Sequence, residues 1–314
     1  MYDSGPSCIE RLRKIADQIR FVFDSYRDAQ EPVGDAHERA ALGTHLVING
    51  VCCRQHQRAV VAQVCGQRGN LEMSNIAPQD ISNQIPAWSI LTSGYLFRDP
   101  DHLRSFFTSD VGAEMKALAE GQLGIKILGP TFYGTRQVGL RGNRKIATPA
   151  DMAGVKLRMP GGEAWQFLGR ALGANPTPMA YAEVYTGLQT GAIDGQDKPL
   201  PNVDNMKFYE VMDQIVLTSH LVAFDLLTVS GRFWEKLTEE QRAAFQTAAD
   251  GAIGWSTEQH VTREAEIAKS FAERGLDVYA PDLAAFRSHV QKAYLESDLA
   301  KEWPAGMIER IAAA

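Results

Sequence analysis

The stretch VKLRMPGGEAWQFLGRALGANPTPMAYAEVYTGLQTGAIDGQ, residues 155–196, decides the fold class of this chain. Its first five residues alternate apolar and basic side chains, which is the two-residue period of a half-buried strand. Helical spacing follows over residues 163–172 and 181–190, and Gly173 and Gly191 stand where such helices end. Strands that alternate with helices in this way predict an α/β architecture.

The segments on either side continue the alternation. Residues 105–120 have the pattern of a helix, and residues 125–128 and 221–229 are apolar runs of strand length. Residues 238–241 fit a capping box, and helical spacing continues from there to Arg274. That run is about twice the usual helix length, so it predicts one very long helix.

Length and charge limit the class of protein. The chain has 314 residues, enough for about two domains. Its 32 basic and 38 acidic residues give a net charge of −6, which argues against a nucleic-acid-binding protein, because such proteins need a basic face. No run approaches the roughly 20 apolar residues of a membrane helix, so the chain is not expected to span a bilayer.

The first 70 residues show few signals. All four cysteines (Cys8, Cys52, Cys53 and Cys65) lie there, and with His56 their spacing matches no structural zinc pattern, so no metal site is expected. Residues 1–6 lack the basic start and apolar core of a secretory signal. Either the protein is not exported, or its signal is absent from this sequence.

Common catalytic signatures are also missing. The sequence contains no GxSxG elbow, no HExxH, no phosphate-binding GxxxxGK[ST], and no GxGxxG after a strand. His220 is interpreted as a structural histidine with its hydrogen bonds satisfied, and Asp194 as a turn residue. The chain is therefore not predicted to be an enzyme, and no cofactor is expected.

Three basic residues stand in otherwise ordered surroundings, namely Arg136, Arg158 and Lys198. Arg158 lies on the polar side of the alternating strand, just before a Pro-Gly-Gly turn. A guanidinium offers a rigid fork of donors that matches the two oxygens of a carboxylate. The chemistry of these residues suits recognition of an anion.

From about Leu71 to the C-terminus the sequence resembles the periplasmic solute-binding proteins of TRAP (tripartite ATP-independent periplasmic) transporters, the DctP-like family. The resemblance is strongest over residues 134–237, where several family blocks occur in order and at family spacing. These blocks are GTRQ (134–137), PADMAGVKLRMP (149–160), LGANPTPM (172–179), EVYTGLQTGAIDGQ (183–196), FYEV (208–211) and WEKL (234–237).

The resemblance implies a two-lobed periplasmic-binding-protein fold, with crossing strands and a long helix that spans both lobes. Lobe I would comprise residues 1–133 plus 224–263, of which residues 1–70 are atypical for the family. Lobe II would comprise residues 134–223 plus 264–314 and would carry the main carboxylate-binding arginines.

The resemblance also implies the site residues. Arg158 would make the principal salt bridge to a ligand carboxylate, Arg136 a further contact, and Tyr181 would line the pocket. Lys198 replaces a common asparagine and would add another cation. Asp225 corresponds less securely to a pocket position, where it could pair with Lys198 or stand as a lone carboxylate.

The implied function is that of the extracytoplasmic solute-binding subunit of a TRAP-type secondary transporter. It would capture a small organic acid, close its lobes and meet the small and large membrane permease subunits, in the periplasm. A ligand-sensing partner of a membrane receptor would use the same pocket. An enzyme acting on a small carboxylate would use Arg158 as anchor and Asp194 or His220 as base.

Overall fold

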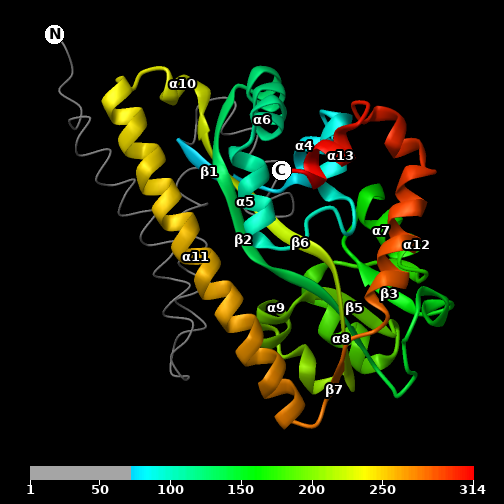
Figure 1. Cartoon of the computed structure of the whole chain (residues 1–314). Coiled ribbons are helices and arrows are strands. Elements are labelled where there is room, and N and C mark those ends of the chain that lie inside the picture. The colour runs from blue at the N-terminus through cyan, green and yellow to red at the C-terminus, as the bar shows by residue number, and fades with distance from the viewer. Residues whose placement is uncertain (1–71) are drawn as a thin grey trace, which may run out of the picture.

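The structure is a computed structural model that describes residues 72–314. Within these residues a seven-stranded mixed sheet runs through the molecule in the order β1-β6-β2-β5-β3-β4, and β7 pairs with β6 (Figure 1). The strands are β1 (Met73–Ile76), β2 (Ile125–Leu140), β3 (Lys156–Met159), β4 (Asn175–Pro178), β5 (Gly195–Pro199), β6 (Gln214–Ser230) and β7 (Asp277–Tyr279).

Helices cover the sheet and confirm the predicted α/β class. The longer ones are α5 (Pro100–Thr108), α6 (Asp110–Leu123), α7 (Glu163–Ala171), α11 (Glu239–Glu273) and α12 (Leu283–Leu295). The shorter ones are α4 (Pro78–Ser82), α8 (Val184–Thr190), α9 (Leu200–Asn205), α10 (Gly231–Trp234) and α13 (Met307–Ala312).

Several predicted elements differ in the structure. The strand expected over residues 221–229 is β6, Gln214–Ser230, and the helix expected over residues 181–190 is α-helical only from Val184. The single helix expected over residues 105–120 is two helices, because Ser109 is extended and its hydroxyl caps α6 by accepting from the Gly112 amide at 3.2 Å. The strand expected to end at Leu128 continues to Leu140 as β2, because a register shift between Ile127 and Gly129 carries the pairing with β6 past the Gly-Pro step.

The long helix predicted from residue 238 is confirmed as α11. The Thr238 hydroxyl accepts from the Gln241 amide at 3.2 Å, and the Gln241 side chain accepts from the Thr238 amide at 2.9 Å. Gly251 and Gly254 do not interrupt this 35-residue helix. Figure 1 shows α11 running along one side of the molecule beside the long strands β2 and β6.

The described residues contain four hydrophobic clusters, two in each half of the molecule. We use lobe I for the half that holds β1, α4, α5 and α6, and lobe II for the half that holds β3, β4, β5, α7, α8 and α9. The long strands contribute to both: Phe132 and Val222 pack in lobe I, whereas Val138 and Leu221 pack in lobe II. Helix α11 also contributes to both, through residues 245–253 of its first half and through Ile267 and Phe271 near its end.

The C-terminal helix α13 packs with lobe I. Its Met307 and Ile311 belong to the cluster that contains Trp88 and Phe106. Helix α12, which precedes it, packs against α7 in lobe II. Residues of α13 thus pack with the lobe I cluster, and the predicted lobe boundaries stay a prediction.

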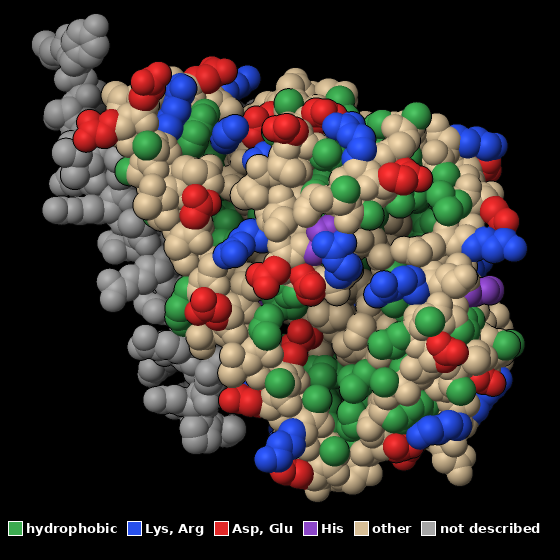
Figure 2. All heavy atoms as spheres, viewed as in Figure 1, with side chains coloured by type: hydrophobic (Ala, Val, Ile, Leu, Met, Phe, Trp, Pro, Cys, Tyr) green, Lys and Arg blue, Asp and Glu red, His purple; other side chains and the backbone are tan. Residues whose placement is uncertain are grey.

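No helix within residues 72–314 is long and apolar enough to cross a membrane. Figure 2 shows acidic and basic side chains intermixed over the visible face. The cysteines considered above as zinc ligands lie outside the described residues, and the described part contains no cluster of metal-ligating side chains.

Candidate functional site

The carboxyl ends of three parallel strands bring the predicted lobe II residues together. Strands β4 and β5 both pair in parallel with β3. Arg158 and Lys198 are the last residue but one of β3 and β5, and Tyr181 follows β4. Open α/β sheets bind ligands outside the carboxyl ends of their strands. The three residues therefore share the edge of the sheet at which a ligand is expected.

Arg158 is the most deeply placed of these cations. It is 2% exposed, and its Nε and Nη2 donate to the Met179 carbonyl oxygen at 3.0 and 2.7 Å. Its Nη1 is buried without a hydrogen-bond partner in the described part of the chain. Burial lowers the pKa of Arg158 to about 10, so the guanidinium is charged at neutral pH. A buried charged donor left unpaired is costly, and an incoming carboxylate would satisfy it.

Lys198 and Tyr181 lie beside Arg158. The Lys198 Nζ is 4.8 Å from the centre of the Tyr181 ring, and the Arg158 Cζ is 5.9 Å from it. Burial lowers the pKa of Lys198 to about 7, and Arg136 and Arg158 contribute to this shift. In residues 72–314 no carboxylate lies within 4.0 Å of Lys198. Two cations thus face one aromatic ring.

Arg136 is buried and already paired. Its Nε and Nη2 donate to the Asp197 carboxylate at 2.6 and 2.9 Å, and Nη2 also donates to the Asp197 carbonyl oxygen at 2.9 Å. The Trp165 ring lies 4.4 Å from its Cζ. The predicted contact between Arg136 and a ligand therefore stays a prediction, since much of its hydrogen-bonding capacity is spent on Asp197.

Asp197 is a residue that the sequence analysis missed. Arg136 and His220 hold the pKa of this fully buried carboxyl well below its usual range against the effect of burial. The His220 Nε2 lies 3.3 Å from Asp197 Oδ2, and its Nδ1 lies 2.8 Å from the Thr218 hydroxyl. The interpretation of His220 as a buried histidine with its hydrogen bonds satisfied is confirmed. The sequence signal available for Asp197 was its position beside Lys198, directly after the EVYTGLQTGAIDGQ block.

Asp225 lies across the lobe boundary from these residues, on the lobe I part of β6. Burial raises its pKa to about 6, the nearby Asp80 adds to the shift, and Lys198 opposes it. No ion pair within 4.0 Å joins Asp225 to Lys198 in the described residues. Of the two alternatives left open by the sequence, the structure thus shows a carboxylate that Lys198 influences but does not contact directly.

Asp80 was also missed by the sequence analysis. It lies in the first turn of α4, and its Oδ2 is buried with no hydrogen-bond partner in residues 72–314. Burial raises the pKa of this carboxyl, although a backbone hydrogen bond at Ala77 opposes the shift. The signal available in the sequence was an acidic residue two positions after Pro78, at the start of a helix.

Asp194, by contrast, has a structural role. Its Oδ2 accepts from the Lys156 amide at 2.8 Å, and Oδ1 lies 3.7 Å from the Lys156 Nζ. Its backbone also bonds to neighbouring strands, as its carbonyl oxygen accepts from the Arg141 amide. The prediction of a turn aspartate is confirmed.

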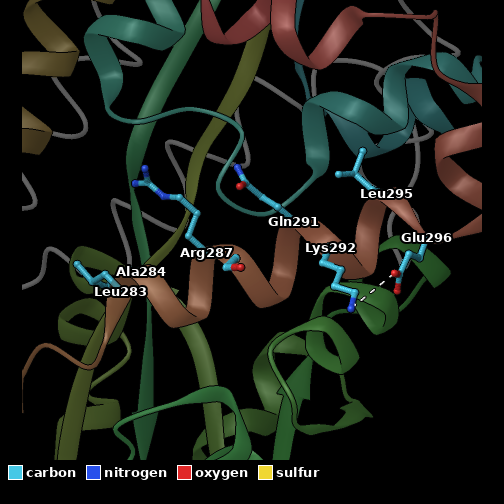
Figure 3. Close-up of a pocket in the computed structure, with 8 residues that line it drawn as sticks. Leu283, Ala284, Arg287, Gln291, Lys292, Leu295 and Glu296 are labelled. Carbon is cyan, nitrogen blue, oxygen red and sulfur yellow. Dashed lines mark ion pairs between the residues drawn. The ribbon is translucent and has the colours of Figure 1, made fainter.

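A concave region lies along α12, away from these residues (Figure 3). It is an open groove in which Lys292 pairs with Glu296 at 3.8 Å and Gln291 donates to the Tyr95 carbonyl oxygen at 3.2 Å. None of the five predicted site residues lines this groove. Its charged groups are exposed, so it lacks the buried cation that distinguishes the edge of β3 and β5.

Comparisons with known proteins show the family of this chain. The family model described as "Bacterial extracellular solute-binding protein, family 7" matches residues 56–299. The chain is 33% identical over 245 residues to the sialic acid-binding periplasmic protein SiaP of Vibrio cholerae, covering 76% of each chain.

Two solved structures are similar over most of the chain. A TRAP periplasmic solute-binding protein from Roseobacter denitrificans, with bound 3-deoxy-D-manno-oct-2-ulosonic acid, has 41% identity and a TM-score of 0.78, and the match covers 90% of this chain and 97% of that one. A TRAP periplasmic solute-binding protein from Chromohalobacter salexigens, with bound D-glucuronate, has 26% identity and a TM-score of 0.72, with 81% and 84% covered.

Proposed function

Because the chain belongs to the family 7 bacterial extracellular solute-binding proteins of TRAP transporters, we propose that it captures a small organic acid through Arg158. The single observation that carries this proposal is the buried Arg158 guanidinium, whose Nη1 has no partner in residues 72–314. A carboxylate that accepts from Nη1 would pair the charge in a site shielded from water, where charge-assisted hydrogen bonds are strong.

The remaining predicted residues complete the proposed site. Lys198 adds a second cation near the carboxylate, and the Tyr181 ring beside both cations forms an apolar wall. Arg136 would contact the ligand through guanidinium N–H groups that do not bond to Asp197. The Trp165 ring covers its guanidinium. Asp225 would face the ligand from lobe I.

Capture would be coupled to closure of the lobes. Lobe I and lobe II have separate hydrophobic clusters and share β2, β6 and α11. A ligand held by Arg158 in lobe II gains further contacts when lobe I approaches, so it stabilises the closed arrangement by that difference in affinity. The closed form would then be the one that the small and large membrane permease subunits recognise.

Location and chemistry follow from the family. Family members are periplasmic solute-binding proteins, and we propose the same location for this chain. Its relatives are solute-binding proteins and not enzymes. The two groups considered as a catalytic base, Asp194 and His220, are both engaged in structural hydrogen bonds. We therefore propose that the site binds its ligand without changing it.

The decisive experiment is calorimetric titration of the wild-type protein and of Arg158→Ala with 3-deoxy-D-manno-oct-2-ulosonic acid, D-glucuronate, sialic acid and succinate. Loss of one partner of a buried charge pair is expected to weaken binding of the preferred acid about 100-fold or more. Arg104→Ala, which removes an exposed arginine of α5, serves as the control and should bind as wild type. Unchanged affinity in Arg158→Ala would overturn the proposal.

A further inference from the structure

The topology places two carboxylates, Asp80 and Asp225, near each other in lobe I. Strand β1 ends at Ile76, which is opposite Leu226 in the antiparallel pairing with β6. The chain then runs past Asp225 and begins α4 at Pro78, with Asp80 in its first turn. The pairing of β1 with β6 thus brings Asp80 and Asp225 to the same end of lobe I.

No cation neutralises this pair directly. Within residues 72–314 neither Asp80 nor Asp225 has a lysine, arginine or histidine nitrogen within 4.0 Å. The Oδ2 of Asp80 is buried with no hydrogen-bond partner in the same residues. Two neighbouring carboxylates, one of them with an oxygen that accepts no hydrogen bond, cost free energy in a buried site. Such a site gains most from a ligand that supplies hydrogen-bond donors.

Lys198 connects this pair with the cations of lobe II. Its positive charge interacts with Arg136 and Arg158, which lower its pKa, and with Asp197 and Asp225, which raise it. The site therefore has opposite polarity at its two ends. The end at Arg158 offers an unpaired donor, and the end at Asp80 offers an unpaired acceptor, Oδ2, with the Asp225 carboxylate nearby.

We propose that Asp80 and Asp225 determine specificity by accepting hydrogen bonds from ligand hydroxyl groups and by repelling a second carboxylate. This inference rests on the function proposed above and makes the ligand a polyhydroxylated monocarboxylate. Its carboxylate would bind Arg158 in lobe II, and its hydroxyl groups would donate to the two aspartates as the lobes close. A dicarboxylate of similar length would bring its second charge against both aspartates.

The test compares acids that differ at the end remote from the carboxylate, by calorimetry at pH 7. The hydroxylated probes are 3-deoxy-D-manno-oct-2-ulosonic acid, D-glucuronate and D-gluconate. The other probes are adipate, with a second carboxylate, hexanoate, with no donor, and 6-aminohexanoate, with an amine. We expect the tightest hydroxylated acid to bind the wild-type protein at least tenfold more tightly than adipate and hexanoate. The ammonium of 6-aminohexanoate would pair with the two aspartates, so this acid distinguishes a site for hydroxyl groups from a site for an amine.

Asp225→Asn then tests the residue itself. The amide keeps the shape of the carboxylate but removes its charge, so affinity for the hydroxylated acid should fall and affinity for adipate should rise. The ratio between the two should shrink about tenfold. Asp80→Asn should act in the same direction, and Asp110→Asn, at an exposed position on α6, is the matched control. Melting temperatures show whether each variant is folded.

The outcomes separate this inference from the proposed function. If Arg158→Ala abolishes binding but the ratio in Asp225→Asn matches wild type, the assignment of the two aspartates is wrong and carboxylate capture stands. If adipate or 6-aminohexanoate binds the wild-type protein as tightly as the hydroxylated acids, the ligand class is also wrong. If no acid binds, both proposals fail.

Discussion

At the scale of single residues, the two lobe II cations differ in how their charge responds to pH. Burial lowers the pKa of Arg158 only to about 10, so it stays charged at pH 7. The pKa of Lys198 is lowered to about 7, so this amine is half protonated there. The groups that act on its charge are Arg136, Asp197, Arg158 and Asp225. Arg158 is thus a permanent anchor, whereas Lys198 can take up a proton when an anion arrives.

This difference predicts a pH dependence of binding. An anion near Lys198 favours its protonated form, so above pH 7 binding must take up a proton and affinity should fall by up to about tenfold per pH unit. Calorimetry between pH 6.5 and 9 with the tightest acid of the panel should show this fall. In Lys198→Met it should be absent, and affinity at pH 6.5 should be lower than in wild type.

Lys269→Met, which removes an exposed lysine of α11, is the control and should keep the wild-type pH profile. Proton uptake can be measured independently by repeating the titration in buffers of different ionisation enthalpy. A wild-type affinity that does not change from pH 7 to 9 would contradict the prediction.

At the scale of elements, β2 changes register where it passes from lobe I to lobe II. Its pairing with β6 shifts between Phe132 and Gly134 and again between Arg136 and Val138. Between these shifts the Thr135 amide donates to the Glu264 carboxylate of α11 at 2.6 Å. The strand is therefore tied to the long helix at the point where it crosses between the lobes. Burial raises the pKa of Glu264 to about 7.

Gly134 allows this crossing and should not tolerate a side chain. Its φ is +130°, and a Cβ atom there would lie 2.5 Å from the Pro199 Cβ. Gly134→Ala is therefore expected to lower the free energy of unfolding by about 1–3 kcal/mol, measured by urea denaturation.

Gly121→Ala is a matched control for that substitution. Gly121 lies inside α6, and a Cβ atom there would meet nothing within 4 Å. Alanine is the better helix former, so this variant should gain up to about 1 kcal/mol. Equal effects of the two substitutions would show that Gly134 has no special role at the crossing.

At the scale of the whole molecule, two cores share a few continuous segments. The strands β2 and β6 and the helix α11 each enter both lobes, and the remaining helices pack with one lobe or lie at their junction (Figure 1). Lobes joined in this way can move as bodies about the shared segments. The proposed ligand would sit between Arg158 and the aspartates of lobe I, so it would favour their approach.

Binding should therefore make the molecule more compact. Small-angle X-ray scattering should show a smaller radius of gyration when the tightest acid of the panel is present at saturating concentration. Arg158→Ala at the same ligand concentration should keep the radius of the free protein. A radius that does not change in wild type, under conditions where calorimetry shows full binding, would exclude closure on capture.

The sequence by itself determined the α/β class and the positions of α7, α8 and α11. These features depend on local causes: the period of apolar residues, the Thr238 cap, and glycines at helix ends such as Gly191. Arg158 was singled out as the candidate anchor by the resemblance to the TRAP family. The sequence also placed His220 correctly as a structural residue. It did not separate α5 from α6 or extend β2 past Gly129, because a single capping hydroxyl and a strand bulge decided those points.

Only the tertiary structure decided which charged side chains have an ion-pair partner and which keep an unsatisfied donor or acceptor. The pairing of β2 with β5 brings Arg136 to Asp197, and that of β1 with β6 brings Asp80 to Asp225. Arg136 and Asp197 are 61 positions apart in the sequence, and Asp80 and Asp225 are 145 positions apart, so no local sequence pattern shows that they lie close together. The energy of each charge depends on its burial and on the neighbours that the fold supplies. The same cause leaves Arg158 with an unsatisfied donor, which the sequence could not show.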